Sequence, residues 1–134
     1  MNILVDTQLL IWSLYDESKL GPSAIYYMEQ FENTLFYSVA SIWEIAIKHH
    51  RKPEQVPVTP EELYNFCEQY DYFNLPIKAS HVIATSYLKD PPESIRHKDP
   101  FDRLLLAQAK TEGMRLLTHD DKLAAYDEAC VLLV

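Results

Sequence analysis

Glycine is scarce in this sequence, with two glycines among 134 residues. The Walker phosphate-binding loop, the G-x-G-x-x-G turn of dinucleotide-binding folds and the G-x-S-x-G nucleophile elbow each need several glycines close together. The sequence therefore excludes the classes of enzyme that depend on those loops. Eight prolines mark the loops of the chain instead.

Cysteine is equally scarce, and long hydrophobic runs are missing. Cys67 and Cys130 lie far apart, which excludes a C-x-x-C site and a disulfide framework, and the histidines show no zinc-ligand spacing. Two unpaired cysteines are typical of a reducing cytoplasm, where we expect the protein to act. The first residues lack the basic start of a signal peptide, and no apolar run approaches the roughly 20 residues of a membrane span.

Basic residues are outnumbered, 12 against 20 acidic ones, which gives a formal net charge of −8. An acidic chain argues against a nucleic-acid partner held by bulk charge. That argument fails if the acids surround a bound cation, because the cation reverses the local sign of the charge. The positions of the acidic residues therefore matter more than their number.

Short apolar and β-branched runs alternate with amphipathic segments along the whole chain. They predict strands at 2–5, 34–37, 114–117 and 130–134, with a possible fifth at 73–75. Helices are predicted at 9–15, 22–32, 38–50, 60–70, 78–88, 101–112 and 121–126; Ser38 or Ser41 would cap the third, Thr59 the fourth, and Gly113 would end the sixth. This order predicts a single α/β domain over 1–134, with a parallel central sheet of four to five strands flanked by helices.

Five carboxylates stand beside the predicted strand ends. Asp6 and Asp120 directly follow strands, Glu44 lies on the helix after the second strand, and Asp99 and Asp102 start the helix before the third. Because ligands of open parallel sheets bind at the carboxyl ends of the strands, we expect these acids to meet at one edge. Clustered carboxylates repel one another unless a cation neutralises them, and oxygen ligands suit Mg²⁺ or Mn²⁺. The pattern predicts a divalent-metal site suited to phosphodiester hydrolysis.

Each acid also has a structural interpretation. Asp6, Asp99 and Asp120 stand where helix N-caps are expected, and Asp102 could favour the dipole of the helix that Asp99 caps. Glu44 could be an exposed residue that pairs with Lys48 four positions later. Capping does not require an acid at each strand end, and it does not account for Glu44. We therefore favour the metal hypothesis for the set as a whole.

Four ordered blocks of sequence resemble the PIN domain: LVDT at 4–7, SIWEIAIK at 41–48, HKDPFDRLLLAQA at 97–109 and LTHD at 117–120. They resemble more closely the VapC-like toxin ribonucleases of type II toxin–antitoxin systems, over essentially the whole chain. The resemblance implies a metal-dependent endoribonuclease that uses Mg²⁺ or Mn²⁺, is neutralised by a cognate antitoxin protein and pairs with itself as a homodimer.

The resemblance also implies roles for particular residues. Metal-binding and catalytic roles fall on Asp6, Glu44, Asp102 and Asp120, and supporting roles on Asp99 and Thr118. A metal-activated water would cleave RNA to leave a 5′-phosphate and a 3′-hydroxyl.

Two basic clusters lie next to these acids in the sequence. RNA phosphates could be bound by Lys48, Arg51, Lys52, Arg96, Lys98 and Arg103. The first cluster could equally be a solvated helix end, where cations are favoured by the dipole, and Arg103 could pair with a carboxylate of the site. Aromatic residues at 12, 15, 26 and 27 could form a groove for an antitoxin, a dimer face or part of the core.

Two other functions compete with the ribonuclease. A metal-dependent phosphatase of small phosphorylated substrates also uses clustered acids, but its D-x-D-x-T signature is missing after the first strand, where the chain has Asp6, Thr7 and Gln8. A non-catalytic scaffold that binds RNA or protein is the other, and the presence of all the acids argues against it.

Overall fold

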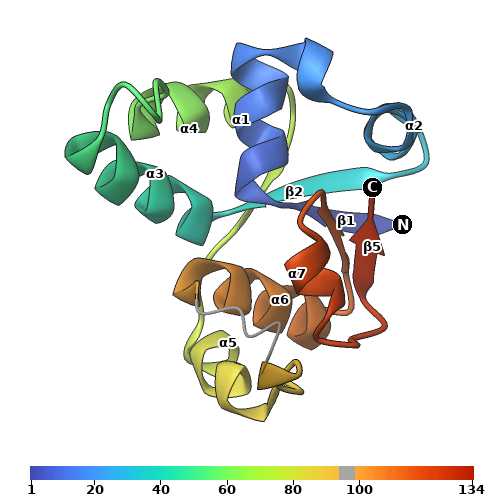
Figure 1. Ribbon diagram of the computed structural model, residues 1–134. Coiled ribbons are helices and arrows are strands. Elements are labelled where there is room, and N and C mark those ends of the chain that lie inside the picture. The colour runs from blue at the N-terminus through green and yellow to red at the C-terminus, as the bar shows by residue number, and fades with distance from the viewer. Residues whose placement is uncertain (94–98) are drawn as a thin grey trace.

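Five short strands form one parallel sheet in the order β3-β2-β1-β4-β5 (Figure 1). The computed structural model describes residues 1–93 and 99–134. The strands are β1 (Asn2–Val5), β2 (Thr34–Ser38), β3 (Phe73–Leu75), β4 (Arg115–Thr118) and β5 (Val131–Leu133). The predicted α/β fold with a parallel sheet is confirmed, and the possible strand at 73–75 is its fifth member.

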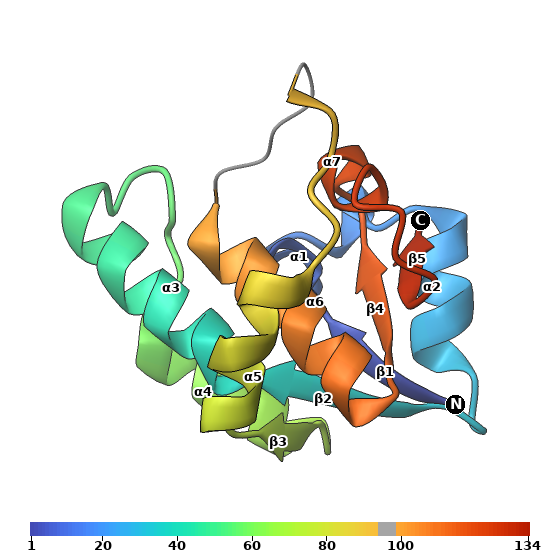
Figure 2. The same ribbon diagram turned by 90° about the horizontal axis from the view of Figure 1, so that it is seen from below.

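Helices cover both faces of the sheet (Figures 1 and 2). They are α1 (Thr7–Tyr15), α2 (Pro22–Glu29), α3 (Val39–Arg51), α4 (Pro60–Gln69), α5 (Ala79–Ala84), α6 (Pro100–Glu112) and α7 (Asp121–Ala124), with 3₁₀ turns at Glu17–Lys19 and Thr85–Tyr87. Helices α1, α2 and α4 lie on one face and α5, α6 and α7 on the other, whereas α3 contacts both α4 and α6. In the described ranges, no helix has the length and apolar character needed to cross a membrane.

The core consists of two apolar layers, one on each face of the sheet. Neighbouring residues of β1 supply both layers: Ile3 and Val5 pack with α1, while Leu4 packs with α6, and all three are fully buried. Successive side chains of a strand point to opposite faces, so a strand covered on both sides is apolar throughout. This explains why the central strand is an uninterrupted hydrophobic run that ends abruptly at Asp6.

Local capping signals fix the ends of the helices that carry the site. Ser38 caps α3 by accepting a hydrogen bond from the Ala40 amide at 2.9 Å. Thr59 and Glu62 form the expected capping box at the start of α4. Gly113 ends α6 in the left-handed conformation, with φ 68°. These three predictions are confirmed. Capping can be predicted from the sequence because it depends on neighbouring residues.

Two predicted helices end at least three residues earlier in the structure than in the sequence pattern. The helix at 22–32 ends at Glu29, since Asn33 donates from its side chain to the Tyr27 carbonyl and from its backbone to Gln30. The helix at 78–88 gives way to a 3₁₀ turn at Thr85, whose hydroxyl donates to the Val82 carbonyl at 2.6 Å. Polar side chains that satisfy the last carbonyls end a helix before its apolar pattern ends.

Candidate metal site

The site lies where the chain changes direction across the sheet. Strand β1 stands at the centre, and the chain passes from it to β2 on one side but reaches β4 and β5 on the other. The Asp6 amide donates to the Leu117 carbonyl at 3.0 Å, which brings the carboxyl ends of β1 and β4 together. Ligands of open α/β sheets bind at such a point. A cavity of about 830 Å³ opens at this edge.

All five carboxylates singled out in the sequence line this cavity. They are Asp6, Glu44, Asp99, Asp102 and Asp120, and they come from the ends of β1 and β4 and from α3 and α6. The expected meeting of these acids at one sheet edge is therefore observed. Their roles in metal binding and catalysis stay predictions.

Asp6 is the most deeply placed of these acids. One carboxylate oxygen caps α1 by accepting from the Leu9 amide at 2.9 Å, and the other accepts from the Thr118 hydroxyl. Only 4% of the residue is exposed. Burial raises the pKa of Asp6 to about 6; the charge of Glu44 adds to the rise, and the hydrogen bonds from Thr118 and Leu9 oppose it.

Thr118 links two of the carboxylates. Its hydroxyl donates to Asp6 and accepts from the Asp120 amide at 3.0 Å, while the Asp120 carboxylate caps α7 by accepting from the Lys122 amide at 2.9 Å. Because Thr118 is fully buried at the end of β4, it fixes the relative position of Asp6 and Asp120.

Glu44 enters the cavity from α3 and is 5% exposed, so the interpretation of Glu44 as an exposed helical residue is wrong. Its pairing with Lys48 is confirmed: the Lys48 ammonium donates to Oε2 of Glu44. The other oxygen, Oε1, is buried and has no hydrogen-bond partner among the described residues. Burial lowers the pKa of Lys48, but the hydrogen bond and charge of Glu44, with the charges of Asp99 and Asp102, raise it overall.

Asp99 and Asp102 face the cavity from the first turn of α6. Asp99 caps this helix by accepting from the amides of Phe101 at 2.9 Å and Asp102 at 3.4 Å. Its other oxygen lies 3.8 Å from the Lys48 ammonium. The capping interpretation is thus correct for Asp6, Asp99 and Asp120, and it does not compete with the cavity because each of these carboxylates does both.

The donor set suits a hard divalent cation that keeps part of its water shell. No three His, Cys, Asp or Glu side chains in ranges 1–93 and 99–134 form a ready-made coordination group. Mg²⁺ typically binds proteins through one or two carboxylates and retains several waters, so such a group is not required. Among the described residues Oε1 of Glu44 has no hydrogen-bond partner, and the raised pKa of Asp6 indicates negative charge that is only partly compensated. A divalent cation held by these oxygens would supply the positive charge that compensates them.

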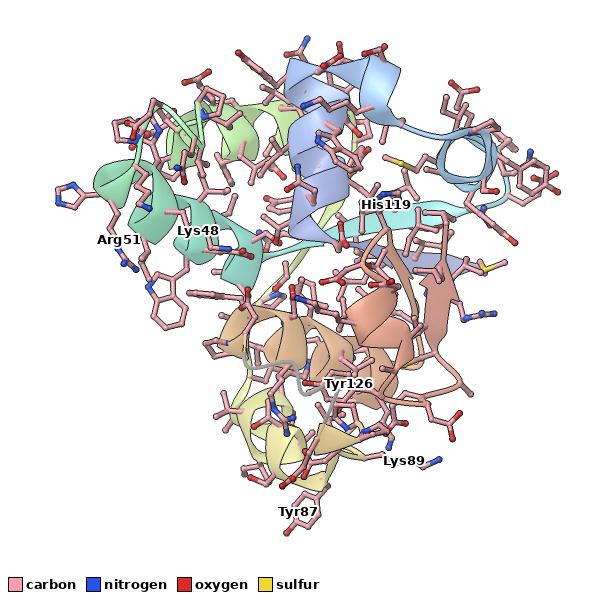
Figure 3. The ribbon with its side chains drawn as sticks, viewed as in Figure 1. Lys48, Arg51, Tyr87, Lys89, His119 and Tyr126 are labelled. Atoms are coloured by element: carbon pink, nitrogen blue, oxygen red, sulfur yellow. The ribbon has the colours of Figure 1, made fainter. Side chains whose placement is uncertain are left out.

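The predicted RNA-binding residues are distributed unequally. Lys48 lines the cavity, whereas Arg51, the last residue of α3, is exposed (Figure 3). Lys52, the C-cap of α3, is exposed too. Arg96 and Lys98 lie outside the described residues.

Arg103 makes contacts that lie away from the cavity. Its guanidinium donates to Asp90 at 3.2 Å, to the Thr85 carbonyl at 2.8 Å and to the Tyr126 hydroxyl at 3.3 Å. It also stacks over the Tyr126 ring at 5.5 Å. These contacts tie α6 to the segments that flank it, and Asp90 is not among the carboxylates of the cavity. These contacts of Arg103 do not include the predicted pairing with a carboxylate of the site.

Several side chains of the site were missed in the sequence. Asp121 lines the cavity beside Asp120, and its adjacency was the available signal. The Thr7 and Ser41 hydroxyls share a buried hydrogen bond of 2.8 Å that ties α1 to α3. That contact had no sequence signal, because it joins residues 34 positions apart.

His119 and Trp12 form one wall of the cavity. The two rings meet edge to face with centroids 5.2 Å apart, and Nδ1 of His119 lies 3.1 Å from the Val134 carbonyl. Figure 3 shows His119 across the site from Lys48 and Arg51. Of the aromatic residues predicted to form a surface or part of the core, Trp12 therefore belongs to the wall of the site. Tyr15 and Tyr26 are exposed, at 64% and 58%.

Comparison with known protein families shows which family the chain belongs to. The family model of the PIN domain matches residues 3–129, nearly the whole chain. The chain belongs to the PIN domain family. The resemblance inferred from the four sequence blocks is thereby confirmed. Among curated proteins, none matches this PIN domain.

Solved structures share the fold of this PIN domain over nearly its full length. VapBC2 from Rickettsia felis, bound to a DNA fragment from its promoter, matches with a TM-score of 0.69 and 16% identity, covering 100% of this chain and 98% of that one. DNA-bound VapBC from Salmonella typhimurium gives 0.64 and 12%, covering 100% and 97%. VapBC-5 from Mycobacterium tuberculosis gives 0.59 and 20%, covering 99% and 97%. At these identities the similarity shows a common fold, which agrees with the VapC-like resemblance.

Proposed function

We propose that this PIN domain is an endoribonuclease dependent on Mg²⁺ or Mn²⁺ and the toxin of a type II toxin–antitoxin pair. One observation carries the proposal: five carboxylates from distant segments line a single cavity at the sheet edge, and a buried oxygen of Glu44 lacks a partner among the described residues. Buried unpaired carboxylate oxygens are costly, so an arrangement that retains them favours cation binding.

The side chains of the site divide into metal ligands and supporting residues in the proposed reaction. Asp6, Glu44, Asp102 and Asp120 would hold the metal ion directly or through water, with Asp99 and Thr118 in support. When bound, the ion polarises a phosphoryl oxygen and lowers the pKa of a bound water. Thr118 keeps one oxygen of Asp6 in place, and the α1 amide of Leu9 keeps the other, so Asp6 needs little rearrangement to bind a cation.

RNA would reach the cavity along the C-terminal end of α3. Arg51 and Lys52 are exposed there and suit phosphate contacts, which do not depend on sequence. Local positive charge is needed because the chain as a whole is acidic. Arg96 and Lys98 remain predicted contacts, whereas the existing contacts of Arg103 give it a structural task.

An antitoxin and a second copy of the chain are the proposed partners. The solved structures with the same fold include VapBC assemblies and a toxin–antitoxin complex from Klebsiella pneumoniae. Tyr15 and Tyr26 expose more than half of their surface on α1 and α2, and exposed aromatic residues are enriched in protein interfaces. The two free cysteines support the expected cytoplasmic location.

Cleavage of RNA by the purified protein tests the proposal. We expect cleavage with Mg²⁺ or Mn²⁺, loss of cleavage in excess EDTA, and a loss of at least about a hundredfold in the Asp6→Asn variant, because Asp6 is central to the cation site. Circular dichroism should show that the variant is folded. Glu61→Gln is the matched control, since Glu61 is exposed on α4 and does not line the cavity.

The same assay separates the alternative functions. Hydrolysis of a phosphomonoester such as p-nitrophenyl phosphate without RNA cleavage would replace the ribonuclease by the phosphatase. Undiminished RNA cleavage in EDTA would refute a metal-dependent mechanism, and RNA binding without cleavage under any metal would favour the non-catalytic scaffold.

A further inference from the structure

We propose that Lys48 is a resident cation of the acidic cavity: it positions Glu44 and compensates the charge of Glu44 and Asp99, so that the cavity binds one divalent ion instead of two. This inference rests on the proposed metal-dependent function. It assigns Lys48 to the cavity itself instead of to the RNA surface suggested by its place in the sequence.

Contacts of Lys48 carry the inference. Its ammonium donates to Oε2 of Glu44 on the same helix and lies 3.8 Å from Oδ2 of Asp99 on α6. Lys48 thus connects two walls of the cavity, one lined by Glu44 and the other by Asp99. The Lys48 side chain is 42% exposed and the Glu44 side chain, taken without its backbone, 7%, so the ammonium reaches inward from a partly open position.

The two oxygens of Glu44 are in different environments because of this contact. Oε2 is held by Lys48, while Oε1 is buried without a partner among the described residues. A side chain held by one oxygen presents the other in a fixed direction. The charge of Glu44 also acts on Asp6, so the two carboxylates are close enough to interact. Lys48 therefore positions Glu44 for a cation shared with the Asp6 side of the cavity.

Lys48 also occupies carboxylate oxygens that a second metal ion would need as ligands. Sites with two metal ions hold them roughly 3.5–4 Å apart and need carboxylate oxygens for both. Here the Glu44 and Asp99 oxygens that face Lys48 are already compensated by its positive charge. A second divalent ion at these oxygens would lie against the Lys48 ammonium, and like charges repel, so the ion could bind only by displacing Lys48. The Asp6 and Asp120 side remains for one divalent ion.

Metal stoichiometry tests the inference directly. Mn²⁺ is titrated into the metal-free full chain at pH 7.5, by isothermal calorimetry and by equilibrium dialysis. The proteins compared are the wild type, Lys48→Met, Lys48→Arg and Lys52→Met. Methionine keeps the length of the side chain without its charge, arginine restores the charge, and Lys52 is an exposed lysine four residues later that does not line the cavity. We expect one Mn²⁺ per chain in the wild type, Lys48→Arg and Lys52→Met, and two in Lys48→Met.

The outcomes separate this inference from the proposed function. Two Mn²⁺ ions in the wild type, or one in a Lys48→Met variant whose circular dichroism matches the wild type, would overturn the role of Lys48. If Lys48→Met does not fold, one Mn²⁺ in the wild type and one in Lys48→Arg support the role, and a second ion in either overturns it. RNA cleavage is assayed in parallel: cleavage without the expected stoichiometry refutes only the role of Lys48, whereas failure of the wild type to bind Mn²⁺ refutes both proposals.

Discussion

At the residue scale, Asp6 is a buried carboxylate whose ionised form is only partly compensated in the metal-free protein. It accepts hydrogen bonds from Leu9 and Thr118, yet its pKa is raised to about 6 from an ordinary 3.8. Compared with the unfolded chain, the folded state therefore shifts Asp6 toward its protonated form. Site carboxylates that bind cations commonly cost stability when the cation is absent, and this residue illustrates the reason.

We expect Asp6→Asn to stabilise the metal-free protein at pH 7.5 by about 2 kcal/mol. The shift of about two pKa units corresponds to roughly 3 kcal/mol, from which the weakened Thr118 hydrogen bond removes about 1 kcal/mol. The sign follows from the raised pKa: the contribution of Asp6 is fully present below about pH 4 and is lost as pH rises through about 6. The gain from the substitution should therefore disappear at pH 4. Urea unfolding in EDTA at both pH values measures it.

Glu61→Gln serves as the control for this experiment, because Glu61 is exposed and does not line the cavity. Its effect should stay within about 0.5 kcal/mol at both pH values. A wild type as stable as Asp6→Asn at pH 7.5 would show that Asp6 is already compensated without metal.

At the element scale, α6 has a task at each end. Its first turn carries Asp99 and Asp102 into the cavity, and its last residue is followed by Gly113 in the left-handed conformation. The Gly113 amide donates to the Ala109 carbonyl, which closes the helix before β4 begins. A single glycine thus fixes the end of the helix that carries these carboxylates.

We expect Gly113→Ala to lower the free energy of unfolding by about 1 kcal/mol, because an L-residue is strained at φ 68°. Gly21→Ala is the matched control: Gly21 caps α2 with φ −75°, and a Cβ at either glycine would meet no atom within 4 Å. Its effect should stay within about 0.5 kcal/mol. Equal losses in the two variants would contradict the conformational explanation.

At the scale of the whole molecule, the cavity joins segments that are otherwise separate. Its acids come from β1, α3, α6 and the end of β4, so a cation bound there links both helical layers through the sheet edge. Since the unfolded chain cannot assemble this set, cation binding should stabilise the folded state.

We expect Mg²⁺ at a hundred times its Kd to stabilise the protein by about 2.7 kcal/mol, which raises the Tm by roughly 8 °C for a domain of this size. Differential scanning fluorimetry measures the shift. NaCl at matched ionic strength is the control for screening, and Asp6→Asn should lose most of the effect. A rise of the same size with NaCl alone would exclude a specific site.

Local patterns in the sequence determined much of this protein. The alternation of apolar runs and helices predicted the parallel sheet, Ser38, Thr59 and Gly113 predicted helix ends, and the carboxylates at strand ends predicted one edge of the sheet as the site. Each of these features depends on residues close in the sequence or on a general rule of parallel sheets. They could therefore be derived without knowledge of which segments pack together.

Only the tertiary structure decided how the charges are compensated. The sequence predicted the pairing of Lys48 with Glu44, but it also placed Lys48 with the RNA contacts and left Arg103 between two tasks. Packing adds Asp99 to the contacts of Lys48 and takes Arg103 to Asp90. It also buries Glu44 with one oxygen unpartnered among the described residues. The reason is physical: the energy of a charge depends on burial and on all the opposite charges around it, and segments distant in the sequence contribute to both.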